Sequence, residues 1–231
     1  MSNFNKLLIE CEKSIDFHTN HLNYLRQQVG LLEEAKRLIK KANPKTDFED
    51  FDEIENLNNY NGYLTISTLD LAVNLKHLIL AKTDWEKVFF IKNSYLIIHE
   101  TLNRLKPSKN DFLIEKSITK DYPSLSKNLK ELIEDIDKFK TSSEYKKIEK
   151  TRHHTAGHIT DSLKRYYDRI SDLDGEIAAK NIIEFMKISR KALDLTKDYA
   201  ILANDRSVEK NKKIEKSFVE TLERLKKLIK K

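Results

Sequence analysis

The chain has 231 residues, of which 35% are charged and 39% hydrophobic, and its formal net charge is +6. This length fits one large domain with enough apolar residues for a core. Only four glycines and three prolines are present, which favours long helices with few turns and therefore an all-α fold. The single cysteine, Cys11, excludes an internal disulfide and a Cys-based zinc site.

The positive charge permits a nucleic-acid partner but does not require one, since helices rich in Lys and Glu reach such values without any such function. No segment is apolar for long enough to span a bilayer. The first residues lack the basic-then-apolar pattern of a signal peptide. We therefore expect a cytoplasmic protein without a membrane partner.

The first predicted helix covers residues 2–41 and carries an apolar stripe with a 3.5-residue repeat over five heptads. Pro44 ends it. His18 falls in the stripe, which favours a hydrogen-bonded core histidine. The less favoured alternative joins His21 to it at a metal ion. Cys11 also lies on the stripe and is expected to pack there.

Residues 45–62 are acidic and poorly periodic, and they predict a loop. Apolar or amphipathic segments further along predict more helices. These cover residues 64–81, 85–106, 124–140, 141–170, 176–204 and 207–231. Asp84 and Ser207 are the expected N-caps of two of them, and residues 141–143 offer a cap for the helix that follows. Together they predict a mainly antiparallel bundle with a long N-terminal helix.

Residues 150–170 hold three of the seven histidines and three of the nine arginines. Read as one helix, this region has a buried stripe that starts at Tyr145 and Ile148, and Arg152 takes the next inward position. An unpaired inward charge is costly, so the guanidinium must meet a carboxylate, a phosphate or a wet cleft. On such a helix, His158 would lie about 9 Å along the axis and about 120° round from Arg152.

The run Arg152-His153-His154-Thr155-Ala156-Gly157-His158 resembles the Arg-x(4–6)-His signature of the HEPN superfamily. These are helical domains found in prokaryotic RNase toxins and abortive-infection defence proteins. Residues 85–105 also resemble the central helix of such domains. The resemblance covers residues 64–204 of one domain, with residues 1–41 and 207–231 as additions. Some toxin members carry a tyrosine two residues after the histidine, where this chain has Thr160.

The resemblance implies metal-independent RNA cleavage without a cofactor, by attack of the ribose 2′-OH on the adjacent phosphodiester. His158 would act as general acid or base, and Arg152 would hold the phosphate. His153 would orient one of these groups or bind phosphate, with His154 and Arg165 as further substrate-binding candidates. Since one Arg and one His about 9 Å apart poorly surround one phosphate, we expect a homodimer that joins two motifs at one cleft. HEPN nucleases are similar in this respect, and a protein antitoxin would be a further partner.

Other readings stay open. A non-catalytic HEPN-like module would bind RNA, a nucleotide or a partner protein through Arg152 and His158. A helical metalloprotein would use His154 and His158, which are four residues apart, with Glu149 or His99 added. A scaffold without a small-molecule site is a further alternative. The lysines of residues 207–231 form either an RNA-facing surface or a solvated face.

Overall fold

The computed structural model describes residues 3–44, 49–105, 120–153 and 163–229. Within these ranges the chain forms seven α-helices and one short 3₁₀ turn, with no strand, which confirms the all-α prediction. The helices are α1 (Asn3–Ala42), α2 (Glu49–Leu80), α3 (Asp84–Leu105), α5 (Ser126–Thr141), α6 (Ser143–Thr151), α7 (Leu163–Ile170) and α8 (Gly175–Ile229), and η1 (Pro123–Leu125) precedes α5.

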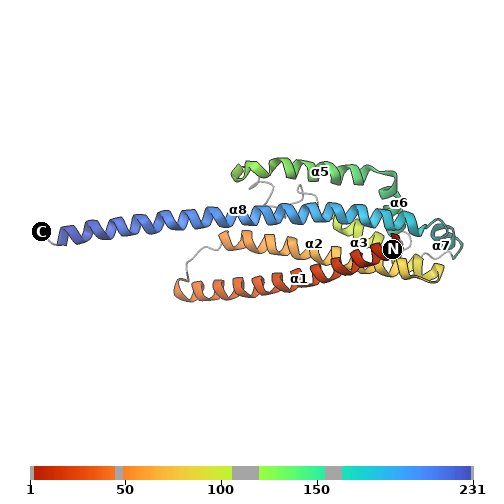
Figure 1. Ribbon diagram of the computed structural model, residues 1–231, viewed down its shortest axis with the longest axis horizontal. Helices are drawn as coiled ribbons and strands as arrows, with labels where there is room; N and C mark the ends of the chain where they lie inside the picture. Colours follow the sequence, from red (N-terminus) through yellow and green to blue (C-terminus); the bar gives the residue numbers. More distant parts are fainter. Residues whose placement is uncertain (1–2, 45–48, 106–119, 154–162, 230–231) are drawn as a thin grey trace.

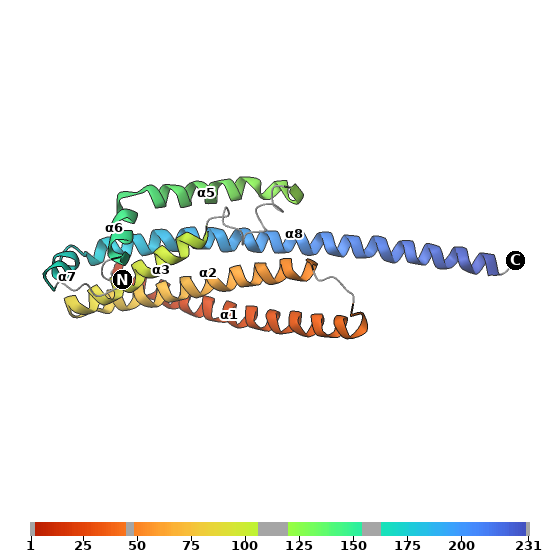
Figure 2. The same cartoon turned by 180° about the vertical axis from the view of Figure 1, so that it is seen from behind.

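The long helices lie side by side as an elongated, mainly antiparallel bundle (Figure 1). The α1 and α2 helices form a hairpin, α8 packs along α2, and α5 covers the opposite side of α8. The short α6 runs across the bundle from the end of α5 towards α3, as the reverse view also shows (Figure 2). The C-terminal part of α8 extends well past the other helices.

The core is built mainly from α2, α3 and α8, because each presents an apolar face to the other two. Leu71 of α2, Ile91 and Ile98 of α3, and Phe185 of α8 are all fully buried. Contact between these side chains ties the three helices into one cluster that also takes in Leu132 of α5. Burial of apolar side chains supplies most of the favourable free energy of folding for such a bundle.

The stripe predicted on the first helix faces α2. Cys11, His18 and Leu25 are its buried members, each seven residues from the next, whereas Phe4 at the helix start is 63% exposed. Seven residues are about two helical turns, so these side chains form one line along the contact. Burial raises the pKa of the Cys11 thiol to about 11, which agrees with the packing role expected for it.

The loop predicted at residues 45–62 is wrong for most of its length, because α2 begins at Glu49. Asp52 lies in the first turn of α2, where an acidic side chain interacts favourably with the positive end of the helix dipole. Lys36 of α1 pairs with Asp52 and with Glu55 at 3.0 and 2.7 Å, which holds the start of α2 against α1. Residues 45–48 lie outside the described part.

The cap predicted for α3 is displaced by one residue. The hydroxyl of Thr83 accepts a hydrogen bond from the Glu86 backbone N–H at 3.2 Å, and the Glu86 carboxylate accepts from the Thr83 N–H at 2.9 Å. This reciprocal pair is a capping box. Asp84 instead lies in the first turn, where it pairs with Lys87 at 2.9 Å.

The break predicted between two C-terminal helices is absent, since α8 runs without interruption from Gly175 to Ile229. Ser207 is therefore not an N-cap but an interior residue. Arg206, next to it, forms an ion pair with Asp121 at 3.2 Å and lies over the Tyr122 ring. Among the described helices, none is both long and apolar enough to cross a membrane.

Candidate functional site

The short helix α6 positions the first residues of the Arg-His motif. The Ser142 hydroxyl caps this helix by accepting a hydrogen bond from the Tyr145 N–H at 3.1 Å, as the sequence predicts. Tyr145 and Ile148 are buried and fix α6 against its neighbours. The α-helix ends at Thr151, and Arg152 and His153 continue in a π-helical turn. Turns of this kind often occur at functional sites.

The helix expected over residues 141–170 is therefore not one continuous α-helix, since α6 ends at Thr151 and α7 begins at Leu163. His154, His158 and the departure noted at Thr160 lie in residues 154–162, outside the described part. Arg165 lies in α7, and its side chain is also outside the described part.

Arg152 meets a carboxylate, one of the three partners that its inward position predicts. Its Nε and Nη2 atoms both donate to Oε1 of Glu100 on α3, at 3.1 and 2.7 Å. The two side chains are 32% and 48% exposed, so water screens the pair, and such pairs contribute about 0–1 kcal/mol to stability. The ion pair therefore orients the guanidinium more than it stabilises the fold.

His153 lies on the free side of that guanidinium. Nη1 of Arg152 and Nδ1 of His153 are 3.3 Å apart, a distance at which the guanidinium donates and the imidazole accepts. The edge of the exposed His153 ring meets the buried ring of His99 at 5.6 Å between centroids. A cation with donors that no described residue occupies and an exposed imidazole thus lie together at the surface.

His99 is the buried residue against which the His153 ring packs. It is 7% exposed, and its Nε2 and Nδ1 atoms lie 3.1 Å from the Asn103 amide nitrogen and 3.1 Å from the Tyr145 hydroxyl. An amide nitrogen can only donate, so Nε2 accepts and Nδ1 carries the proton that is donated to Tyr145. Burial lowers the pKa of the His99 imidazole, and the neighbouring Arg152 lowers it further, which favours this neutral form. His99 is thus a buried histidine with both ring nitrogens hydrogen-bonded.

Tyr145 completes the supporting layer. Burial, with smaller effects of Glu149 and Glu100, raises the pKa of its hydroxyl to about 12, so the group stays protonated. No sequence pattern assigns a role to Glu100, and Tyr145 is predicted only as a stripe residue. Glu100 and His99 are neighbours near the middle of α3, and an acidic residue beside a buried histidine on a central helix is the signal that could have found them.

Comparisons of this chain with protein-family models, with curated proteins and with solved structures return no match. Its candidate site is therefore argued from its own residues.

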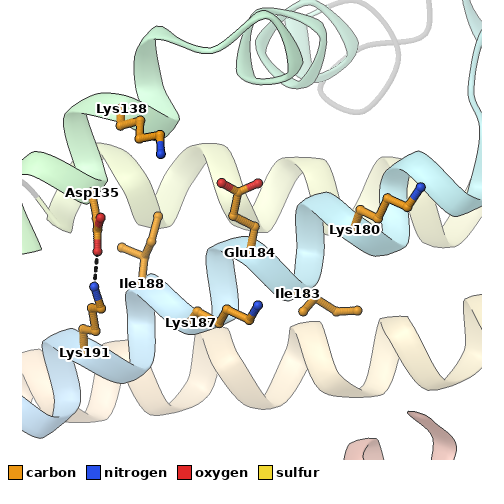
Figure 3. Close-up of a pocket in the computed structure, with 8 residues that line it drawn as sticks. All are labelled: Asp135, Lys138, Lys180, Ile183, Glu184, Lys187, Ile188 and Lys191. Atoms are coloured by element: carbon orange, nitrogen blue, oxygen red, sulfur yellow. Dashed lines mark hydrogen bonds and ion pairs between the residues drawn. The ribbon is translucent and has the colours of Figure 1, made fainter.

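A groove of about 490 Å³ lies between α5 and α8, apart from the Arg152 cluster. Four lysines and two acids line it, as Figure 3 shows, and one pair, Lys191 and Asp135, is joined by a hydrogen bond. The other lining cations are Lys138, Lys180 and Lys187. Phosphate groups of a nucleic acid would find a positive surface here.

The two histidines of α1 behave differently from each other. His18 is 8% exposed, and its Nδ1 has no hydrogen-bond partner among the described residues. Burial lowers its pKa to about 4. Nδ1 of His21 lies 3.2 Å from the Thr65 hydroxyl. No group of three or more potential metal ligands occurs within the described ranges.

Proposed function

We propose that this protein is a metal-independent endoribonuclease of the HEPN type. The observation that carries the proposal is the Arg152 guanidinium, held by Glu100 at 3.1 and 2.7 Å and placed 3.3 Å from an exposed imidazole. Guanidinium groups bind phosphate through paired donors, and imidazoles transfer protons near neutral pH. RNA is the substrate class that this pair and the lysines of the α5–α8 groove would recognise.

The proposed reaction breaks one P–O bond and forms another. A general base removes the proton of the ribose 2′-OH, and the oxygen attacks the adjacent phosphorus. The bond to the 5′-oxygen breaks, and a general acid protonates that leaving group. The products are a 2′,3′-cyclic phosphate and a 5′-hydroxyl. Arg152 would stabilise the added negative charge of the transition state, for which one lost donor typically costs 10²–10³ in rate.

His158 is assigned to proton transfer, with His153 as the neighbouring group that orients Arg152 or binds phosphate. His154 and Arg165 are assigned to substrate binding. A second copy of the chain, related by a two-fold axis near Arg152, would supply a second acid or base to the same phosphate. An antitoxin protein that covers this cleft would block the activity.

The test is cleavage of a labelled RNA by the purified protein in EDTA. Wild-type protein should give cyclic phosphate ends, and Arg152→Ala should lower the rate at least about 100-fold. Arg152→Lys should fail as well, because an ammonium cannot reproduce the planar pair of donors. His158→Ala should lose about 10²–10⁴ in rate. His154→Ala should do less damage.

Arg26→Ala is the matched control for the arginine variants, since Arg26 is an exposed arginine of α1 outside the cluster. His77→Ala is the control for the histidine variants, since His77 is exposed on α2 and its ring stacks on Phe90. Both controls should cleave RNA at the wild-type rate. Cleavage that survives Arg152→Ala, or that stops in EDTA, would refute the proposed mechanism.

A non-catalytic RNA-binding module is the second candidate, and the Glu100 contact favours it. The carboxylate already occupies two donors of Arg152 and competes with a phosphate for the same cation. Under this reading Glu100→Gln should tighten RNA binding, and the RNA should remain intact with wild-type and variant alike. Filter binding and gel analysis of the same samples separate the two candidates.

A further inference from the structure

The C-terminal part of α8 is a long exposed helical segment. We call residues 207–229 the α8 tail. Just before it, Arg206 contacts Asp121 and Tyr122. From Ser207 to Glu220, each residue with a described side chain is exposed. Both views show the tail extending past the ends of the other helices (Figures 1 and 2).

The tail nevertheless carries an apolar stripe. Val208, Phe218 and Val219 are 43%, 63% and 49% exposed. The sequence continues the stripe at helical spacing with Leu222, Leu225 and Ile229. A helix in a protein gains most of its stability by burying such an apolar face. We therefore expect another helix or surface to cover this stripe.

The charge of the α8 tail indicates which kind of surface it would bind. Residues 207–231 hold nine Lys and Arg against four Glu, so they carry +5 of the chain's net charge of +6. Residues 49–55, the start of α2, hold five acidic residues and no basic one, and Lys36 neutralises only part of that charge. The same chain thus contains a cationic apolar tail and an acidic segment, where Ile54 is 48% exposed.

The acidic segment lies at the base of the tail. Thr196 of α8 donates a hydrogen bond to Asn61 of α2, which fixes the register of these two antiparallel helices. Glu49 is twelve residues before Asn61, and Val208 is twelve residues after Thr196. Residues 49–55 are therefore level with residues 202–208, where the tail leaves the bundle.

We propose that two copies of this chain associate through their α8 tails, antiparallel and around a two-fold axis near Phe218. In this arrangement the cationic tip of each tail, with Lys226 and Lys227, reaches the acidic start of α2 in the other copy. A parallel pair would instead gather the cationic tips, where like charges repel. A strip along one side of the tail offers on the order of 500 Å². A stable interface buries about 800 Å² per partner. In this proposal the contact between the tail and α2 of the other copy buries the rest of that area.

This interface is distinct from the shared cleft proposed at Arg152 and does not rest on the proposed function. The Arg152 cluster lies on α3 and α6, beside the first half of α8, while the tail lies beyond the other end of the bundle. Tail association alone leaves the two Arg152 clusters far apart. If both interfaces form, the tail contact joins two Arg152-linked dimers into a larger assembly. Loss of the tail contact then halves the mass of that assembly.

The first experiment measures mass in solution by sedimentation and light scattering of the full chain. At micromolar concentration the wild-type protein should be associated, and Phe218→Glu should halve its mass. Phe4→Glu is the matched control, because Phe4 is also 63% exposed but lies at the start of α1. It should leave the mass unchanged. A monomeric wild-type protein, or a mass unaffected by Phe218→Glu, would overturn the proposal.

The second experiment reads the orientation. A spin label on Glu209→Cys should give a separation of about 27 Å along the axis in an antiparallel pair, since residue 209 then faces residue 227 of the other copy. A parallel pair would bring the labels to about one interhelical distance, near 10 Å, and would refute the arrangement. The native Cys11 is buried with a raised pKa, so labelling is directed to the introduced cysteine.

The third experiment excludes another occupant, because a cationic apolar helix also suits an anionic membrane surface. Wild-type protein should stay in the supernatant with vesicles of phosphatidylcholine and phosphatidylserine at physiological salt. Sedimentation of a monomeric protein with these vesicles, lost in Phe218→Glu but retained in Phe4→Glu, would assign the tail to the membrane and overturn the self-association.

Discussion

Replacing Tyr145 with phenylalanine tests the layer beneath the candidate site. The ring is 3% exposed and packs against Phe139 and His99, so Tyr145→Phe keeps the packing and removes only the hydroxyl. The Nδ1–H of His99 then loses its acceptor in a buried position. An unpartnered buried donor costs about 1–3 kcal/mol. For a chain of this size, each kcal/mol lowers Tm by about 2–4 °C.

The assay is urea unfolding followed by circular dichroism and by fluorescence, with coincident transitions as the check on two-state behaviour. Tyr95→Phe is the matched control. Tyr95 is 4% exposed, and among the described residues its hydroxyl accepts one long hydrogen bond, of 3.4 Å, from Asn181. We expect this variant to lose less than about 1 kcal/mol.

A double variant tests the His99–Tyr145 hydrogen bond directly. With His99→Leu present, Tyr145→Phe should cost less than it does alone, because no imidazole donor is left without a partner. If Tyr145→Phe is no more destabilising than Tyr95→Phe, or if its cost is unchanged by His99→Leu, then the hydrogen bond derived for His99 is wrong.

Three further predictions concern α1 and α3. Thr83→Ala removes the capping hydroxyl of α3 and should cost about 1 kcal/mol in urea unfolding, whereas Thr141→Ala, whose hydroxyl bonds only carbonyls of its own helix, should cost less. The folded-state pKa of His18, about 4, lies below its ordinary value of 6.5, so the unfolded chain binds the proton more tightly. Stability should therefore fall as the pH drops from 6.5 towards 4, by at most about 1.4 kcal/mol per pH unit for this residue, and His18→Leu should reduce that fall. The Cys11 thiol, buried and with its pKa raised to about 11, should react with a thiol reagent at neutral pH far more slowly than in urea. A thiol that reacts equally fast in both conditions would place Cys11 outside the α1–α2 contact.

Local sequence rules located most of the helices, because they depend on side chains a few residues apart. The period of the apolar stripes gives α1 and α5, and Ser142 marks the start of α6. Sparse glycine and proline give the all-α class. The burial of Tyr145 and Ile148 follows from the same spacing.

Two predicted boundaries were wrong. Residues 49–62 lack a clear apolar period, yet they are helical, and Lys36 pairs with Asp52 and Glu55 across the α1–α2 contact. Ser207 has the chemistry of a cap, yet the helix continues through it. A residue with cap chemistry also fits a helix interior when the chain on both sides remains helical, and local propensity does not distinguish these cases.

The charge of Arg152 and its need for a partner were readable from the sequence, but the identity of that partner was not. Glu100 is 52 residues away along the chain, and only the packing of α6 on α3 brings its carboxylate within 2.7 Å of the guanidinium. The same packing places the Tyr145 hydroxyl 3.1 Å from Nδ1 of His99, where it accepts a hydrogen bond from that imidazole. Sequence alone thus predicted most of the helices and the need of Arg152 for a partner. Tertiary structure decided which of those residues meet, because contacts between distant segments depend on how whole helices pack.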